Sequence, residues 1–127
     1  MRKALMIEAA VKPAGHYSHA IVANGFIYVS GQGPADPVSG KVPDGFAAQV
    51  RQTLNNLQII LEGAGASMRD IVKVNSYLSD VTRFQEYNEI YREVFAQDPP
   101  ARTTIGCQLV GILVEIDCVA VLPGDHG

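Results

Sequence analysis

The sequence predicts an α+β fold in which two helices cover one face of a single mixed sheet. Three features support this: an Asn-Gly pair between two β-rich runs, two segments with apolar residues at steps of three and four, and later segments that alternate apolar and polar residues. The element order is therefore β-β-α-β-α-β-β. The chain has 127 residues, so we expect one domain with one core across residues 1–127.

The first two strands are predicted from a hairpin signal. Residues 19–23 and 26–30 are rich in β-formers, and Asn24-Gly25 separates them. Both turn residues tolerate positive φ, which favours a type I′ turn. Residues 1–15 hold a short apolar patch followed by a turn-rich segment, and no strand is expected there.

Two segments carry helical apolar stripes. Residues 46–62 present one stripe to the core, and glycines follow as a stop signal. The second helix begins at Thr82, which matches a capping box with Gln85, and ends before Asp98-Pro99-Pro100. The stripes consist of Phe46, Val50, Leu54, Leu57 and Leu61 in the first helix and of Phe84, Tyr87, Tyr91 and Val94 in the second.

Residues 71–78, 103–109 and 113–121 alternate as strands. In the first of these, Val72 shares the apolar face with Val74. Two helices cover only one face of such a sheet, so the other face stays open in a monomer. That face mixes apolar and polar side chains, including Tyr77, Leu113, Glu115, Asp117, Val119 and Val121. We expect it to be buried against copies of the same chain.

Composition excludes several classes of protein. The net charge of −3 and the lack of a Lys/Arg run argue against a nucleic-acid partner. No apolar run approaches the about 20 residues that a membrane span needs. The N-terminus lacks a secretory pattern, so a cytoplasmic protein is expected. Cys107 and Cys118 indicate buried free thiols, and His16 and His19 have no further metal ligands nearby, so no metal site is expected.

The candidate functional residues lie in strand-like runs. Arg102 opens one run, and Glu115 and Asp117 interrupt another that is otherwise apolar. On a covered face a carboxylate must be paired or must titrate abnormally. Ser30-Gly31-Gln32-Gly33-Pro34 predicts a loop at the end of the second strand. Alternatively, its Gly N–H and Ser hydroxyl are presented to a small anion or carbonyl.

Several short motifs follow one another at fitting intervals between about residue 8 and residue 121. They are Gly15-His16-Tyr17-Ser18, Val29-Ser30-Gly31-Gln32, Asn88 within Tyr87-Asn88-Glu89-Ile90-Tyr91, Pro100-Ala101-Arg102 and Val114-Glu115-Ile116. Each motif alone is weak, but the ordered set resembles the Rid (YjgF) family of imine/enamine deaminases. The resemblance implies a chorismate-mutase-like fold, also called YjgF/L-PSP-like. It also implies a homotrimer with inward-facing sheets and clefts between neighbouring subunits.

The resemblance further implies an enzyme, a 2-iminobutanoate/2-iminopropanoate deaminase-like hydrolase. Such enzymes convert reactive 2-imino or 2-enamino acids to 2-oxo acids and ammonia, without a metal or organic cofactor. By position, Arg102 would bind the substrate carboxylate through its planar fork. Glu115 would position or activate the attacking water, or handle protons as the amine leaves. The substrate pocket would be lined by Tyr17, Ser30, Gly31, Asn88 and Thr104.

The sequence also departs from the family pattern. Thr104 stands where many members have Cys, and Cys107, expected on the opposite face of the strand, does not replace it. The segments before Pro100 and at residues 110–112 are shorter than is common, which leaves room for a different imine or a larger substrate. Two other functions stay open. One is a trimer that binds 2-oxo or fatty acids without turnover. The other is an RNA-cleaving or translation-inhibiting protein, against which the acidic charge argues.

Overall fold

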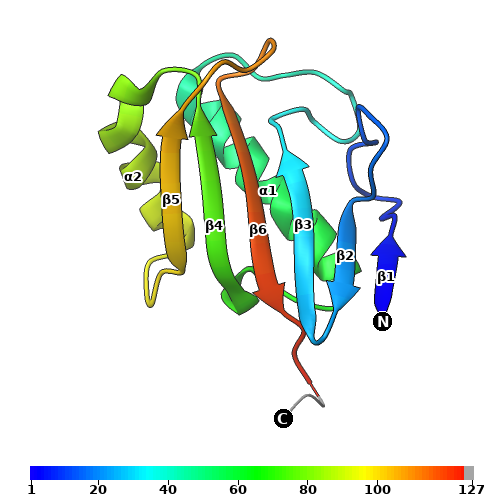
Figure 1. The fold of residues 1–127 in the computed structure, drawn as a ribbon. Helices are drawn as coiled ribbons and strands as arrows, with labels where there is room; N and C mark the ends of the chain where they lie inside the picture. The colour runs from blue at the N-terminus through cyan, green and yellow to red at the C-terminus, as the bar shows by residue number, and fades with distance from the viewer. Residues whose placement is uncertain (125–127) are drawn as a thin grey trace.

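The computed structural model describes residues 1–124, in which six strands form one sheet and both helices pack on the same face of it (Figure 1). The strand order is β1-β2-β3-β6-β4-β5, and all neighbouring strands are antiparallel except β4 and β5. The strands are β1 (Arg2–Leu5), β2 (Ala20–Ala23), β3 (Phe26–Gln32), β4 (Ile71–Leu78), β5 (Ala101–Gly106) and β6 (Val114–Val121). The helices are α1 (Phe46–Gly63) and α2 (Phe84–Val94), with short 3₁₀ turns at Met68–Asp70 and Val81–Arg83.

The hairpin between β2 and β3 is confirmed. Asn24 has φ 51° and Gly25 has φ 79°, as a turn with two left-handed residues requires. The expectation that no strand precedes this hairpin was wrong, because β1 pairs with β2 along the edge of the sheet. The loop predicted over residues 30–34 starts later than expected, since β3 continues to Gln32 through a shift in its register with β6, and only Gly33 and Pro34 of that stretch lie beyond the strand.

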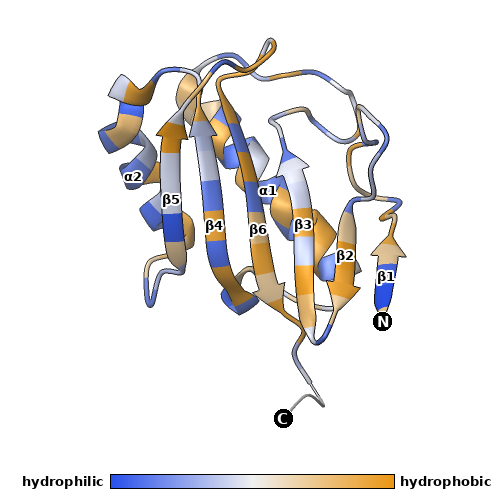
Figure 2. Cartoon of the chain, viewed as in Figure 1, coloured by the Kyte–Doolittle hydropathy of each residue, from blue (hydrophilic) through white to orange (hydrophobic). Residues whose placement is uncertain are grey.

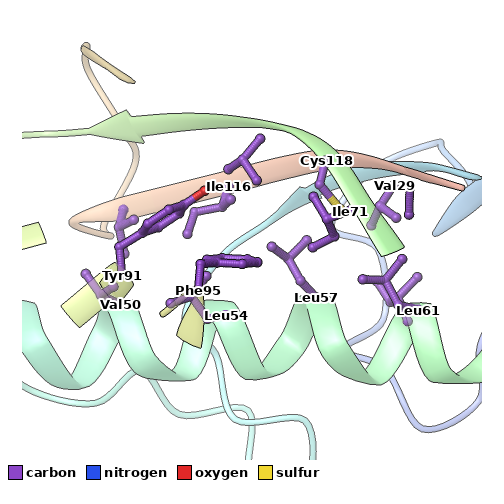
Figure 3. Close-up of a cluster of buried hydrophobic side chains, with 14 of the residues drawn as sticks. Val29, Val50, Leu54, Leu57, Leu61, Ile71, Tyr91, Phe95, Ile116 and Cys118 are labelled. Carbon is purple, nitrogen blue, oxygen red and sulfur yellow. The ribbon is translucent and has the colours of Figure 1, made fainter. Parts of the chain in front are cut away.

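The predicted stripe on α1 forms the core. Phe46, Val50, Leu54, Leu57 and Leu61 are all buried. In Figure 3 the α1 side chains point at the sheet, where Ile116 and Cys118 of β6 meet them. Burial of such aliphatic side chains is the main stabilising contribution to a domain of this size. No helix among residues 1–124 is both long and apolar enough to cross a membrane.

The start of α2 differs from the prediction. The capping box of Thr82 and Gln85 was wrong, because a 3₁₀ turn precedes the helix and Asp80 caps that turn. The Asp80 carboxylate accepts hydrogen bonds from the Thr82 backbone N–H (3.0 Å) and hydroxyl (2.6 Å). An Asp side chain accepts hydrogen bonds from backbone N–H groups as readily as a Thr side chain does. The capping residue is therefore Asp80, two positions before Thr82.

Two strand predictions need correction. Val72 is 42% exposed and does not share a face with buried Val74, because a register shift between β4 and β6 turns the side chain outward. Strand β5 ends at Gly106, so the prediction that it runs to residue 109 was wrong. Cys107 therefore lies beyond the strand and is half-buried, whereas Cys118 is buried; both are free thiols.

Hydrophilic residues interrupt the hydrophobic run of β6 (Figure 2), and the sheet face opposite the helices carries the predicted mixture of side chains. On β6, Val114, Ile116, Cys118 and Ala120 are buried beneath the helices, while Glu115 and Asp117 face the open side. Strand β3 adds Phe26 and Tyr28 to the open face, opposite Val121 and Val119 of β6. This face is uncovered in the single chain.

Candidate functional site

Arg102 lies on the edge strand β5 and points toward α2. Its guanidinium carbon is 4.6 Å from the ring centre of Tyr91, 5.2 Å from that of Tyr87 and 5.6 Å from that of Phe84. Its Nη2 donates a hydrogen bond to Asn88 Oδ1 at 2.7 Å. Helix α2 presents all four partners at helical spacing, so one face of this helix fixes the position of the guanidinium.

The charge of Arg102 has no acidic partner within residues 1–124, where the ion pairs involve only other residues. A guanidinium has five N–H donors, and Asn88 takes one of them. The remaining donors lie beside a cleft of about 350 Å³. The cleft is lined by Asn88, Tyr91, Arg92, Phe95, Pro99, Pro100 and Arg102. A half-buried, unneutralised arginine in a cleft is suited to binding a carboxylate.

Thr104 lies two residues beyond Arg102 on the same face of β5. It is level with Ser76 of β4, whose hydroxyl is paired with that of Tyr87. The Thr104 Oγ1 atom is buried and has no hydrogen-bond partner within the described residues. Arg102, Asn88 and Thr104 together form what we call the arginine half-site.

Glu115 lies on the open side of β6, against the backbone of β3. A Cβ atom built on Gly31 would lie 2.4 Å from the Glu115 Oε2 atom, closer than any side chain tolerates. Glycine at position 31 therefore lets the carboxylate approach the main chain. The register shift between Val29 and Gln32 produces this approach, since a bulge redirects nearby groups.

Burial raises the pKa of Glu115, and the nearby charge of Asp117 raises it further. Asp117 is itself fixed in place by β4: Asn75 Nδ2 donates to it at 2.8 Å and the Tyr77 hydroxyl donates at 2.9 Å. Two carboxyl groups thus share the open face. Asp117 is held by two hydrogen bonds, and Glu115 is free to exchange protons. A glutamate with a raised pKa is suited to general acid–base chemistry.

Polar contacts hold the bulge beside Glu115 in place. Buried Gln32 donates its Nε2 hydrogens to the carbonyls of Ser30 (3.2 Å) and Gly31 (3.3 Å). The Ser30 hydroxyl donates to the Ser18 carbonyl at 2.6 Å. The sequence had not singled out Gln32 as functional, although its place directly after Gly31 was a usable signal.

Tyr17, Gly31 and Glu115 line one cleft of about 260 Å³. Tyr17 stands at its mouth, 45% exposed, and its hydroxyl accepts the Ala14 backbone N–H at 3.1 Å. Ser30 lies in an adjoining hollow that Tyr17 also lines. We call Tyr17, Ser30, Gly31 and Glu115 the glutamate half-site.

The two half-sites lie apart within the chain. Arg102 occupies the helix-covered side of β5, whereas Glu115 occupies the open side of β6, and β4 runs between them. Two strand spacings of about 4.8 Å separate them sideways, in addition to the thickness of the sheet. The residues that the sequence singled out therefore form two groups, and one small acid cannot touch both groups of the same chain.

His19 is buried between the N-terminal segment and the start of β2. It is 3% exposed, its Nδ1 accepts the Ile7 backbone N–H at 2.8 Å, and its Nε2 donates to the Val11 carbonyl at 2.7 Å. Both ring nitrogens are thus used to hold the N-terminal segment against β2. This is a structural role, and it leaves no lone pair of His19 for a metal.

Comparisons of sequence and of structure relate this chain to one group of known proteins. Residues 7–122 match the family model described as endoribonuclease L-PSP. A RutC family protein of Pyrococcus horikoshii is 40% identical over 94% of this chain and 98% of its own. The rat 2-iminobutanoate/2-iminopropanoate deaminase is 38% identical over 95% of this chain and 90% of its own. The solved structure of the YjgF gene product of E. coli has a TM-score of 0.89 at 34% identity, covering 94% of this chain and 98% of that one.

Proposed function

The chain belongs to the endoribonuclease L-PSP (YjgF/RutC) family, and on that premise we propose that it hydrolyses reactive 2-imino and 2-enamino acids to 2-oxo acids and ammonia. One relative, from rat, carries the name of such a deaminase. The proposal rests on the environment of the Arg102 side chain. Its guanidinium is held by Asn88 and three aromatic rings, opens onto a cleft, and has no acidic partner in residues 1–124.

In the proposed reaction Arg102 binds the substrate carboxylate and Glu115 handles protons. The Glu115 carboxylate removes a proton from water as the water oxygen bonds to C2 of the protonated imine. The C=N double bond becomes a single bond, and a tetrahedral carbinolamine forms. Glu115 then returns the proton to the amine nitrogen. The C–N bond breaks with its electron pair leaving on ammonia, while the hydroxyl proton passes back to Glu115 and the C=O bond of the 2-oxo acid forms. The released ammonia takes this proton and leaves as ammonium, which regenerates the Glu115 carboxylate. A 2-enamino acid first takes a proton at C3 and becomes the imine.

The proposal includes a homotrimer whose clefts lie between neighbouring subunits. The arginine half-site of one chain would then face the glutamate half-site of the next, which satisfies the requirement that one small acid meets both. The open sheet faces would turn inward and cover apolar side chains such as Tyr28, 46% exposed, and Ile105, 45% exposed. A cytoplasmic location, where amino-acid metabolism releases such imines, is part of the same proposal.

The decisive experiment generates imines in situ with an amino-acid oxidase and follows ammonia release with and without the protein. We expect clear acceleration by the native chain and none by Arg102→Ala. Arg102→Lys should recover little, because an ammonium cannot grip two oxygens at once. Arg51→Ala is the matched control, since Arg51 forms an exposed ion pair with Glu93 on the helix side. Equal rates for the native chain, Arg102→Ala and buffer would reject the proposal.

One observation favours a second candidate, a protein that binds small carboxylates without turnover. The cleft beside Arg102 is separate from that beside Glu115, so a carboxylate can dock at the arginine half-site alone. Binding of 2-oxobutanoate that depends on Arg102 but not on Glu115, with no hydrolysis of any imine, would establish this alternative. RNA cleavage, which the family description names, has less support because the net charge is −3.

A further inference from the structure

The glutamate half-site shares its cleft with a group of apolar side chains that the proposed chemistry does not use. These are Pro34, Ala35, Val42, Val110 and Ile112, which we call the apolar wall. Val42 is 39% exposed, and Ile112 is half-buried against the backbone of Gly33. The wall faces the same 260 Å³ space as the Glu115 carboxylate.

We propose that the apolar wall makes this chain selective for 2-imino acids with aliphatic side chains longer than methyl or ethyl, such as those formed from leucine or methionine. The inference rests on the proposed function. Carbon C2 of such a substrate carries three groups. The carboxylate goes to Arg102 of the neighbouring chain and the reacting C=N bond faces Glu115, so the side chain is left to lie along the wall.

A single buried amide, Gln49 of α1, holds both sides of the wall. Gln49 is 7% exposed; its Nε2 donates to the Pro43 carbonyl at 3.0 Å, and its Oε1 accepts the Leu113 backbone N–H at 2.8 Å. Pro43 directly follows Val42, and Leu113 directly follows Ile112. The distance between the two sides of the wall is therefore fixed before any substrate enters.

A second buried amide fixes the segment of the apolar wall around Pro34 and Ala35. Asn56, 2% exposed, donates to the carbonyls of Gly33 (2.9 Å) and Ala35 (2.8 Å). A rigid apolar surface selects by size, because it cannot close around a smaller group. When a substrate with a short side chain leaves part of a preformed cavity empty, the lining residues lack the van der Waals contacts that a longer side chain would make.

The size of the cleft agrees with this selectivity. Its 260 Å³ corresponds to roughly nine water molecules at about 30 Å³ each, more than a methyl group fills. Each methylene that fits an apolar pocket changes kcat/KM by about 10- to 200-fold.

Lys12 also lines the cleft but is exposed, so its ammonium stays hydrated at the rim. An imine with a side-chain carboxylate is therefore the informative contrasting substrate.

The test compares kcat/KM for imines made in situ from alanine, 2-aminobutyrate, leucine, methionine and glutamate. We expect the leucine and methionine imines to exceed the alanine imine by at least about 10-fold. Ile112→Ala and Val42→Ala should lower kcat/KM for the leucine imine by about 10-fold and that for the alanine imine by less than about twofold. Val38→Ala is the matched control, because Val38 lies in the same loop as Val42, is 95% exposed and does not line the cleft.

Binding provides a second measurement that does not need turnover. Calorimetry with pyruvate and with 4-methyl-2-oxopentanoate should show the same preference for the branched acid, and Ile112→Ala should remove it. Hydrolysis of all imines with alanine or glutamate preferred, or an unchanged ranking in Ile112→Ala, would overturn the selectivity and leave the proposed function standing. Absence of hydrolysis for every imine would reject the proposed function, while a binding preference that Ile112→Ala removes would still uphold the wall.

Discussion

At position 31 the absence of a side chain lets the Glu115 carboxylate lie close to the main chain of β3, and the burial of this carboxylate affects its protonation. Burial against the bulge and the charge of Asp117 both disfavour the ionised form, so the pKa of Glu115 lies above its ordinary value of 4.5. A group whose pKa is raised on folding stabilises the native state at low pH. That stabilisation is present below the unfolded pKa and is lost as pH rises through the folded pKa.

Two changes should follow from this linkage. Glu115→Gln should raise the melting temperature at pH 8 relative to that of the native chain and leave it nearly unchanged at pH 4, while abolishing hydrolysis.

Asp117→Asn should shift the acid limb of the kcat/KM profile to lower pH, because it removes the smaller of the two causes of the raised pKa of Glu115. Asp44→Asn, an exposed residue in the loop before α1, is the control. An acid limb that Asp117→Asn leaves in place would contradict the coupling.

The contact between Gly31 and Glu115 can be tested by a double-mutant cycle. Gly31→Ala alone should destabilise the chain by about 1–3 kcal/mol, because the new methyl group overlaps the carboxylate. In a Glu115→Ala background the same change should cost much less, since the overlapping atoms are gone. Gly15→Ala is the control, because a Cβ atom there would meet Tyr17 only at an ordinary 3.4 Å. Urea denaturation gives all four stabilities; additive effects would show that the two groups do not touch.

Among the elements, α1 does more than supply the core. Its stripe packs on the sheet, and at the edge of that stripe Gln49 and Asn56 use buried amides to hold loops at residues 33–35, 43 and 113. Such bonds satisfy carbonyls and N–H groups that would otherwise be buried without partners. The helix thereby connects the hydrophobic core with the shape of the cleft beside Glu115.

Asn56→Ala should therefore destabilise the chain by about 2–3 kcal/mol, because it leaves two loop carbonyls without their donor. Its neighbour Asn55 is exposed, and Asn55→Ala should stay within about 0.5 kcal/mol of native. Chemical denaturation of the two variants provides the comparison. Equal stabilities would mean that water replaces the Asn56 amide without cost.

The sequence predicted what depends on neighbours along the chain. The Asn24-Gly25 turn and the α1 stripe follow from local dihedral preference and helical period, and both are present in the structure. Strand β1 was missed because its pairing depends on β2 being in place. Val72 was assigned to the wrong face because a bulge changes the alternation. The roles of Gln49 and Asn56 were also missed, although amides beside an apolar stripe were a signal that could have been followed.

The separation of the site into two half-sites depends on sheet order. Arg102 and Glu115 are thirteen residues apart in the sequence and were expected to meet in a cleft shared by neighbouring subunits. Within one chain they lie apart, because β6 inserts between β3 and β4 and leaves β5 at the edge. Sheet order is a long-range property that the spacing of motifs does not contain.

For the whole molecule, this separation leads to a test of shared clefts. If each cleft takes Arg102 from one chain and Glu115 from its neighbour, Arg102→Ala and Glu115→Gln chains should complement each other. Each variant alone is expected to be inactive. After unfolding and refolding a 1:1 mixture, about a quarter of the clefts in randomly assembled closed rings should receive both native groups.

The expected result is recovery of about a quarter of native activity in the co-refolded mixture, with none in a mixture made without unfolding. Light scattering should report a trimer for each variant and for the mixture, so that loss of assembly is not mistaken for loss of chemistry. A chain carrying both substitutions, co-refolded with Arg102→Ala, is the control: no cleft in that mixture contains a native Arg102. A trimer that never regains activity from the complementary pair would place the reaction within one chain, which the positions of Arg102 and Glu115 on opposite faces of the sheet do not allow for a small acid. In that case the joint action of Arg102 and Glu115 in a shared cleft would have to be withdrawn.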